Sequence, residues 1–332
     1  MTAAVLAGLG AVVPDNLVTN DMLARRLDTS DEWIRSRTGI ATRYAVGRGT
    51  ATSDLAVGAG RRALESAGAE HVGMVVVATT TPDRPCPATG PEVAARLGLG
   101  RVPAYDIAAV CSGFLYGLAA GAGAIAAGIA RDVLVIGAEA FSTIIDPEDR
   151  TTAVIFGDGA GAVVLRAGDR DEPGALLDVE LGSDGGLVDL ITVPAGGSRQ
   201  RTSGREPEPG DRYFRMQGRA VFEQAVLRMT EAAEVVLGRQ GLTSDQVDRF
   251  VGHQANVRIL RAVAHQLGVP AERNLINVDR VGNTSAASIP LALADAAAEG
   301  RLSPGHRVLA CAFGGGATWG SALFTWPDIT VG

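Results

Sequence analysis

The feature that most constrains the fold is the stretch from Tyr105 to Ala130, where apolar residues lead to Cys111 and a helix-like run of Ala and Gly follows it. No charged residue occurs between Ile107 and Ala130, so a membrane span has to be considered. Ala and Gly contribute few large apolar side chains to favour lipid, and we expect no membrane association. A helix of small residues lets neighbouring elements approach closely, so the stretch predicts a helix buried in protein on all sides.

Cys111 occupies the predicted junction between strand and helix. At such a junction, backbone N–H groups and the helix dipole favour a thiolate, which is the nucleophilic form of cysteine. The residue is therefore a candidate nucleophile. The alternative is an inert, buried structural cysteine.

Composition narrows the class of protein. A chain of 332 residues suits two ordinary domains or one large domain of two halves. The net charge of −7 argues against a nucleic-acid partner. Three cysteines without metal-ligand spacing argue against a disulfide framework or a metal site and fit a reducing cytoplasm, and no signal peptide is expected at the start.

Strand and helix patterns alternate along the chain, which predicts an α/β fold with mixed to mostly parallel sheets covered by helices. Two Gly-rich turns, Phe156 to Leu165 and Phe313 to Phe324, each feed an apolar strand and indicate a duplicated half. We expect the halves to span 1–170 and 171–332. Other expectations are a strand over 5–13, a helix over 20–27 capped by Asn20, a helix from a Ser53–Asp54 cap to 68, a surface loop over 196–212 and one helix over 214–238.

Two further residues are candidates for chemistry. His253 lies between a strand end and a helix start, and Asn283 lies in a polar cluster between apolar stretches. Either residue alone has a structural interpretation. Together with Cys111 they suggest a thiolate that attacks a carbonyl carbon, while His253 and Asn283 donate hydrogen bonds to the enolate or oxyanion that forms. Gly315 could bring a backbone N–H close to the sulfur. Spacing alone does not separate this set from that of a cysteine protease.

The surrounding motifs are more specific. The chain contains Cys-Ser-Gly-Phe after an apolar strand, Gly-His-Gln-Ala-Asn around His253, Gly-Asn-Thr-Ser-Ala-Ala-Ser-Ile-Pro around Asn283 and Phe-Gly-Gly-Gly-Ala-Thr-Trp-Gly from Phe313. Thr-Ser-Asp-Glu-Trp-Ile and Phe-Gly-Asp-Gly-Ala-Gly-Ala also match. Along essentially its whole length, the chain resembles β-ketoacyl-acyl-carrier-protein synthase III of the thiolase superfamily.

The resemblance implies a five-layered αβαβα thiolase fold, a homodimer, no metal and no cofactor beyond coenzyme A thioesters as substrates. It implies decarboxylative Claisen condensation of an acyl-CoA primer with malonyl-acyl-carrier protein, which initiates fatty-acid or polyketide chains. Cys111 would carry the acyl group, and His253 and Asn283 would stabilise the enolate. The backbone N–H groups of Cys111 and Gly315 would form the oxyanion hole.

The resemblance also implies contacts to coenzyme A. Trp33 would stack on the adenine with Arg150 on its other face, and Arg37 would meet the nucleotide end. The pantetheine tunnel would be lined by Thr29, Gly218, Ala255 and Asn256.

The chain departs from the family pattern at two places. Cys86 occupies a position that is often a bulky aromatic, on a loop that reaches the acyl pocket of the partner subunit, so we expect a primer larger than acetyl. Arg219 and Arg258 keep positive charge for docking the acidic carrier protein. At three other docking positions the family commonly has basic residues, whereas this chain has Glu223, His265 and Gln266. We therefore expect the carrier protein to dock more weakly or differently.

Three alternatives stay open at this stage. A same-fold acyltransferase would move the acyl group from Cys111 to an alcohol, an amine or a carrier without decarboxylation. A cysteine hydrolase would release the free acid. A non-catalytic binding module would keep the fold without needing the Cys-His-Asn set.

Overall fold

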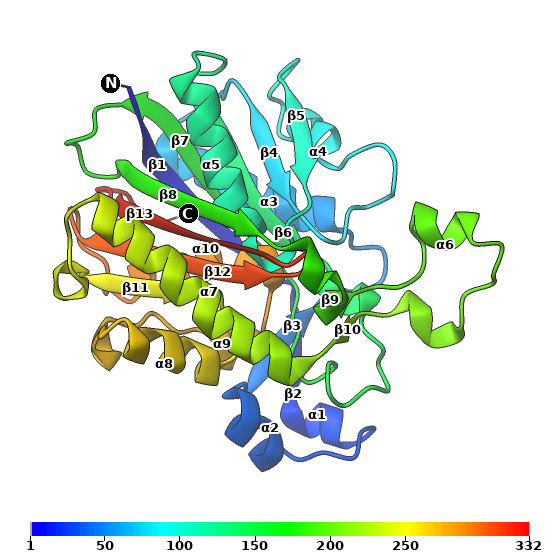
Figure 1. The fold of residues 1–332 in the computed structure, drawn as a ribbon. Coiled ribbons are helices and arrows are strands. Elements are labelled where there is room, and N and C mark those ends of the chain that lie inside the picture. The colour runs from blue at the N-terminus through cyan, green and yellow to red at the C-terminus, as the bar shows by residue number, and fades with distance from the viewer. Residues whose placement is uncertain (1, 332) are drawn as a thin grey trace.

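Two β-sheets lie on either side of a central layer of helices in the computed structural model, which describes residues 2–331 (Figure 1). The first sheet has the order β1-β7-β6-β4-β5, formed by Ala3–Val12, Gly159–Gly168, Asp132–Glu139, Val75–Ala78 and Ala104–Ile107. The second has the order β8-β13-β12-β11, formed by Leu176–Ser183, Thr318–Thr325, Arg307–Gly314 and Arg249–Gly252.

The two sheets repeat one pattern of strand directions. In the first, β1 and β7 are antiparallel, β7 and β6 are antiparallel, and β6 and β4 are parallel. In the second, β8 and β13 are antiparallel, β13 and β12 are antiparallel, and β12 and β11 are parallel. The sheets are therefore mixed, and the shared order supports a duplicated architecture.

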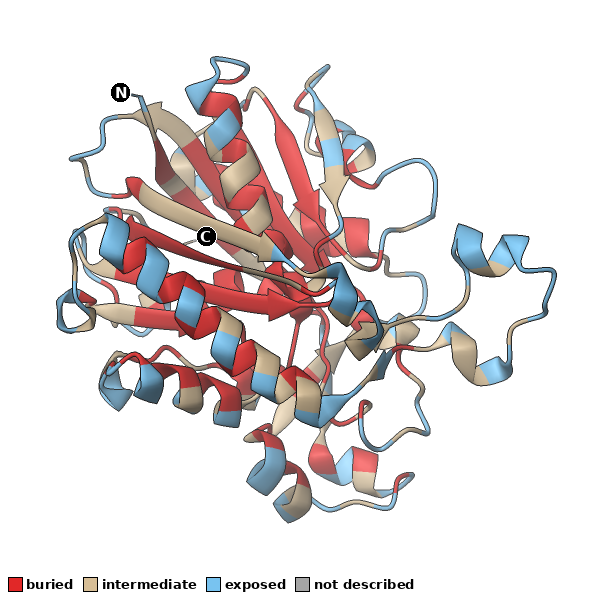
Figure 2. Cartoon of the chain, viewed as in Figure 1, coloured by how far each residue is buried: buried red, intermediate tan, exposed pale blue. Residues whose placement is uncertain are grey.

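Helices α5 (Gly113–Ala126) and α10 (Ser288–Ala298) form the central layer and contribute to one buried core with both sheets. Their small residues permit close contact, since a Cβ on Gly117 would lie 2.8 Å from Val135 Cγ1. The outer faces are covered by α3 (Thr52–Ala67) and α4 (Gly90–Arg96) on the first sheet and by α7 (Gly218–Arg239) and α8 (Val257–Gln266) on the second. This is the expected αβαβα order, and Figure 2 shows its strands as predominantly buried.

Smaller elements surround these layers. Strands β2 and β3 pair antiparallel, as do β9 and β10, and α1, α2, α6 and α9 are short helices. Their bounds are β2 Asn16–Thr19, β3 Thr42–Ala45, β9 Ile191–Thr192, β10 Arg215–Met216, α1 Asn20–Ala24, α2 Asp31–Thr38, α6 Ser198–Thr202 and α9 Val278–Val281. The segment 196–212 projects from the body of the protein, as expected for a surface segment, but it contains α6 (Figure 1).

Several predicted boundaries are wrong for identifiable reasons. The cap of α1 is Thr19, whose hydroxyl accepts from the Met22 N–H. Asn20 is instead buried, where it donates to the Ile40 carbonyl. At α3, Ala51 occupies the N-cap position, and Asp54 accepts from its N–H.

The long helix after the surface segment begins at Gly218, four residues later than expected. The preceding pair Arg215–Met216 is recruited into β10, where tertiary pairing with β9 overrides the helical pattern. Across residues 2–331, no helix is both long and apolar enough to cross a membrane.

Candidate active site

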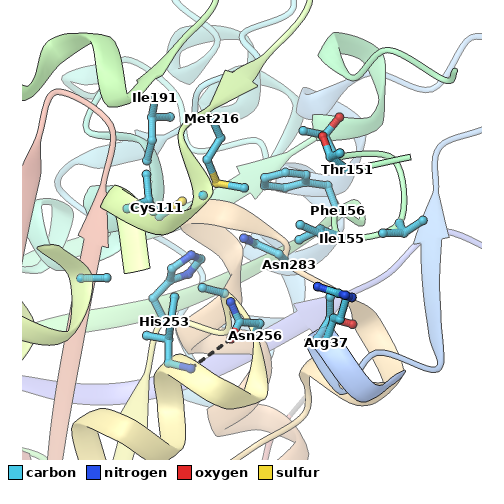
Figure 3. Close-up of a pocket in the computed structure, with 18 of the residues that line it drawn as sticks. Arg37, Cys111, Thr151, Ile155, Phe156, Ile191, Met216, His253, Asn256 and Asn283 are labelled. Atoms are coloured by element: carbon cyan, nitrogen blue, oxygen red, sulfur yellow. Dashed lines mark hydrogen bonds between the residues drawn. The ribbon is translucent and has the colours of Figure 1, made fainter. Parts of the chain in front are cut away.

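A cleft of about 510 Å³ brings Cys111, His253 and Asn283 together. Figure 3 shows the three side chains directed toward the same space, although they come from three separate segments of the chain. The remaining lining residues are Trp33, Arg37, Thr38, Thr151, Thr152, Val154, Ile155, Phe156, Ile191, Phe214, Met216, Gly218, Val221, Ala225, Met229, Ala255, Asn256, Ile259 and Phe313. The three residues predicted from the sequence thus line one cleft, and their catalytic roles stay a prediction.

Cys111 lies in a 3₁₀ turn, Val110–Ser112, between β5 and α5. Val110 has a φ of 45°, which is strained for a β-branched residue and is typical of backbone held at a functional site. The β12–β13 turn supports it, because the Thr318 hydroxyl donates to the Ala109 carbonyl at 3.1 Å. A Cβ on Gly314 would lie 2.8 Å from the Cys111 nitrogen, so only glycine allows this approach.

The thiol of Cys111 is not poised as a thiolate. Burial raises its pKa to about 12, with a smaller raising effect from the charge of Glu139 and a lowering effect from the Ser285 hydroxyl. Burial therefore opposes the stabilisation of the thiolate that we expect from the strand-to-helix junction. Desolvation outweighs the local stabilisation that the sequence position suggests.

His253 is buried and neutral. Its Nδ1 lies 2.7 Å from the Ser288 hydroxyl, and burial lowers its pKa to about 3. When Ser288 donates to Nδ1, the ring proton lies on Nε2. The imidazole is then a neutral hydrogen-bond donor toward the cleft.

Asn283 is fixed through both its backbone and its side chain. Its N–H donates to the Ile155 carbonyl and its carbonyl accepts from the Gly157 N–H, each at 2.9 Å. Its Oδ1 accepts from the Ser285 N–H at 2.9 Å. The amide NH₂ is therefore the group left to donate toward a ligand.

Gly315, the predicted second donor of the oxyanion hole, lies in the turn that supports Cys111. Its carbonyl accepts from the Thr318 hydroxyl at 3.0 Å. Gly315 is not among the residues that line the cleft, and Gly314 makes the closer approach to the Cys111 nitrogen. The role of the Gly315 N–H stays a prediction.

The outer end of the cleft holds the predicted nucleotide contacts. The guanidinium carbons of Arg37 and Arg150 lie 4.9 and 5.4 Å from the centroid of the Trp33 ring. The Arg150 guanidinium also donates a hydrogen bond to the backbone carbonyl of Asp28 at 2.7 Å. The three predicted residues are thus close together, with Trp33 and Arg37 lining the cleft.

Three of the four predicted pantetheine contacts, Gly218, Ala255 and Asn256, line the cleft. Asn256 also caps α8, because its side-chain oxygen accepts from the Ile259 N–H at 3.0 Å. Thr29 does not line the cleft, but its hydroxyl is buried without a hydrogen-bond partner.

Other predicted residues lie outside the cleft of this chain. Cys86 is exposed on the loop before α4. Arg219 is largely exposed at the start of α7, where Glu223 pairs with it at 3.1 Å, and Arg258 lies over the Phe222 ring at 5.9 Å. The part that Arg219 and Arg258 play in carrier docking stays a prediction.

Two parts of the site were not predicted from the sequence. Phe156, Ile191 and Met216 line the cleft near Cys111 (Figure 3), and Phe156 and Phe214, which both line it, form an aromatic cluster with the buried Phe141. Glu139 lies fully buried near the nucleophile. The available signal for Glu139 was a carboxylate directly after the apolar run from Val133 to Ala138.

Comparison with known proteins identifies the family. The model of the 3-oxoacyl-[acyl-carrier-protein] synthase III family matches residues 105–185, and the model of its C-terminal part matches residues 237–326. A protein named β-ketoacyl-[acyl-carrier-protein] synthase III 5 from Streptomyces coelicolor is 63% identical over 99% of both chains. A β-ketoacyl-[acyl-carrier-protein] synthase III from Pseudomonas aeruginosa is 51% identical over 98% of both.

Solved structures agree. The crystal structure of 3-oxoacyl-(acyl carrier protein) synthase III from Pseudomonas aeruginosa matches with a TM-score of 0.94 over 99% of both chains at 51% identity. The priming β-ketosynthase of a polyketide biosynthetic pathway matches with a TM-score of 0.90 at 32% identity, over 99% of this chain and 97% of that one. These matches confirm the resemblance noted in the sequence. The chain belongs to the β-ketoacyl-[acyl-carrier-protein] synthase III family of condensing acyltransferases, which have the thiolase fold.

Proposed function

We propose that this protein joins the acyl group of an acyl-CoA to the malonyl unit of malonyl-acyl-carrier protein with loss of carbon dioxide, initiating a fatty-acid or polyketide chain. The observation that carries the proposal is the meeting of Cys111, His253 and Asn283 in one cleft. A nucleophile with two neutral donors suits a reaction that passes through an acyl-enzyme and then an enolate.

In the first half-reaction, the Cys111 sulfur attacks the thioester carbonyl. The negative charge on the carbonyl oxygen is stabilised by the backbone N–H groups of Cys111 and Gly315. The strained Val110 turn and the close approach of Gly314 support this role, because they hold the Cys111 backbone against the β12–β13 turn.

In the second half-reaction, His253 and Asn283 donate hydrogen bonds to the oxygen of the malonyl thioester. Carbon dioxide leaves, the resulting enolate attacks the acyl group on Cys111, and no base is needed to create the carbanion. The depressed pKa of His253 supports a neutral Nε2–H donor, and the Oδ1 contact of Asn283 turns its amide donors to the cleft.

The coenzyme A arm extends from Cys111 to the mouth of the cleft. Gly218, Ala255 and Asn256 contact the pantetheine, and Thr29 offers it a hydroxyl. At the mouth, adenine inserts between Trp33 and Arg150, with Arg37 at the nucleotide end. The clustering of these side chains around the Trp33 ring supports this path.

Two subunits form a homodimer, and Cys86 of each lies at the acyl pocket of the other. Its exposure in a single chain is consistent with a position buried only by a partner. A thiol in place of a large ring leaves room for a primer longer than acetyl. The acidic carrier protein docks beside Arg219 and Arg258.

Intact-protein mass spectrometry tests this function with a panel of acyl-CoAs followed by malonyl-acyl-carrier protein. We expect an acyl adduct on Cys111 that is discharged as a β-ketoacyl carrier product. Cys111→Ala should form no adduct, whereas His253→Ala should form the adduct but discharge it roughly 10²–10³-fold more slowly. An adduct that the wild-type protein transfers to an alcohol, an amine or a carrier without loss of carbon dioxide would contradict condensation.

A further inference from the structure

Helix α2 carries two side chains of the proposed nucleotide site, Trp33 and Arg37, but it has few buried residues to anchor it. It lies outside the two sheets, next to α1 (Figure 1). It has eight residues, of which only Ile34 and Thr38 are buried. A helix this short is not stable on its own in water, so contacts with its surroundings must hold it. The positions of Trp33 and Arg37 therefore depend on those contacts.

One buried side-chain amide, that of Asn20, bonds both ends of α2. Asn20 is 1% exposed. Its Nδ2 donates to Oδ1 of Asp31, the first residue of the helix, at 2.8 Å. It also donates to the backbone carbonyl of Ile40, two residues beyond the end of the helix, at 2.8 Å. An amide NH₂ has two donors, and both are used here. We call Asn20, with its bonds to Asp31 and Ile40, the α2 clamp.

Arg43 joins the α2 clamp to the wall of the cleft. Its Nη1 donates to Oδ1 of Asn20 at 2.7 Å, and its Nη2 donates to the carbonyl of Val154 at 2.8 Å. Val154 lines the cleft. Arg43 is 2% exposed, and hydrogen bonds so far from water are stronger than those at a surface. Because Arg43 can only donate and the Ile40 carbonyl can only accept, the orientation of the Asn20 amide is fixed.

The aliphatic part of Arg43 packs between two turns at the catalytic end of the cleft. An added Cβ on Gly282 would lie 2.9 Å from the Arg43 Cβ, and one on Gly157 would lie 3.1 Å from it. Gly282 directly precedes Asn283, and the Gly157 N–H donates to the Asn283 carbonyl at 2.9 Å. The side chain that bonds Asn20 thus also packs against the backbone around Asn283. One connected pair of buried side chains therefore joins α2 to the catalytic end of the site.

We propose that Asn20, held by Arg43, is a positioning residue that fixes α2 at the distance from Cys111 that the coenzyme A arm requires. This rests on the proposed function, because it takes coenzyme A thioesters as substrates. Neither Asn20 nor Arg43 is among the residues that line the cleft, so both act through α2. The α2 clamp therefore acts only on substrates that reach Trp33 and Arg37.

The two thioester substrates of the proposed reaction differ in this respect. The primer carries an adenine nucleotide at the end of its pantetheine arm, whereas malonyl-acyl-carrier protein presents the same arm from a protein surface. Displacement of α2 weakens binding of the nucleotide and leaves binding of the pantetheine unchanged. The α2 clamp thus helps the enzyme to select an acyl group on coenzyme A for the first half-reaction.

Three variants test the α2 clamp. Asn20→Asp keeps an oxygen for Arg43 but replaces the donor by an oxygen, which repels Asp31 and the Ile40 carbonyl. Asp31→Ala removes one of the two bonds at a largely exposed carboxylate, so it tests the clamp even where Asn20→Asp fails to fold. Arg35→Ala is the matched control, because it removes the other partner of the same carboxylate and leaves the Asn20 bond in place.

The measurement is KM in acylation of the full-length protein, for an acyl-CoA and for the matching acyl-pantetheine thioester. For acyl-CoA we expect KM to rise roughly tenfold in Asn20→Asp and roughly threefold in Asp31→Ala. Arg35→Ala should change it less than about twofold, because an exposed ion pair contributes little. KM for acyl-pantetheine should stay at the wild-type value in all three variants. Amide hydrogen exchange over 31–38 should be faster in Asn20→Asp than in wild type.

A double-mutant cycle separates positioning from a general structural role. The background is a protein that carries both Trp33→Ala and Arg37→Ala, so that α2 has neither of its proposed nucleotide contacts. Adding Asn20→Asp to this background should raise KM for acyl-CoA no further, because the clamp then has no contact to position. A residue that acts on the cleft in some other way would add its effect in full.

Each result has one consequence. The α2 clamp alone would be overturned by an equal rise in KM for both thioesters, by wild-type KM values and exchange rates in Asn20→Asp, or by a further rise in KM in the background variant. Where Asn20→Asp does not fold, the KM comparisons apply to Asp31→Ala. Failure of every acyl-CoA to form an adduct on wild-type Cys111 would overturn the proposed function instead.

Discussion

The hydroxyl of Ser288 lies 2.7 Å from Nδ1 of His253, across 35 positions of sequence, and sets which ring nitrogen faces the cleft. Ser288 begins the central helix α10, whereas His253 follows β11, so the contact joins two layers of the fold.

Replacing Ser288 by Ala should weaken control of the His253 tautomer. We expect loss of carbon dioxide from malonyl-acyl-carrier protein to slow about tenfold, the cost of roughly one hydrogen bond. Acylation of Cys111 should change much less, because it does not use that donor. Ser288→Thr restores a hydroxyl and should recover the rate. Equal slowing of both half-reactions would indicate a general structural defect.

Gly314→Ala should damage the nucleophile turn. The added Cβ would lie 2.8 Å from the Cys111 nitrogen and displace the backbone that positions the sulfur. We expect a loss of roughly 1–3 kcal/mol in the free energy of unfolding, measured by urea titration, and strongly reduced acylation. Gly123→Ala on α5 is the control, because nothing lies within 4 Å of its added Cβ. A fully active Gly314→Ala protein would contradict the packing argument.

Glu139→Gln should change how stability depends on pH. Burial raises the pKa of Glu139 from 4.5 to about 7, so the folded state binds more protons than the unfolded state between these values. The stabilising effect is complete below pH 4.5 and is lost as pH rises to about 7, on the order of 3 kcal/mol. His253, with its lowered pKa, has the opposite effect as pH rises from about 3 to 6.5.

Because the two effects oppose each other, the informative quantity is the difference between variant and wild type. Urea titrations at several pH values should show Glu139→Gln gaining stability relative to wild type as pH rises through this window. A difference that is constant with pH would show that the Glu139 pKa is not raised.

Trp33→Ala should impair binding of the nucleotide end of acyl-CoA. We expect KM for acyl-CoA to rise about tenfold with little change in kcat, since stacking at a half-exposed ring is worth on the order of 1 kcal/mol. An acyl-pantetheine thioester lacks the nucleotide, so its KM should be unaffected. An equal rise in KM for both substrates would show that Trp33 does not act by binding the nucleotide.

If Cys86 lies at the partner's acyl pocket as proposed, Cys86→Phe should narrow that pocket. Mass spectrometry of acyl adducts should show larger primers lost while acetyl is retained, because the ring occupies the space that the thiol leaves. Cys86→Ser preserves the volume and should keep the wild-type range. Unchanged primer selection in Cys86→Phe would show that Cys86 does not line the acyl pocket.

The sequence was most informative where a residue sits in an extended local motif. The turn at Cys111 and the surroundings of His253 and Asn283 were predictable, as was the alternation that builds the αβαβα layers. Long-range contacts were not. The pKa of Cys111 depends on burial by distant segments, and the cap at Thr19 depends on Asn20 being drawn into the interior.

The unforeseen part of the site has the same explanation. Glu139, Ser285 and Cys111 lie in three segments, and only the fold brings them together. Nothing in the local sequence of β6 specifies which side chains will surround its terminal carboxylate.

The two central helices begin in the same way, and the turns before them hold different parts of the site. Helix α5 follows a 3₁₀ turn beginning at the strained Val110, and α10 follows a 3₁₀ turn beginning at the strained Ser285. One turn carries the sulfur, and the other follows Asn283. The same structural device, a 3₁₀ turn that begins at a residue of positive φ, therefore precedes both central helices, and the two turns hold different chemical groups.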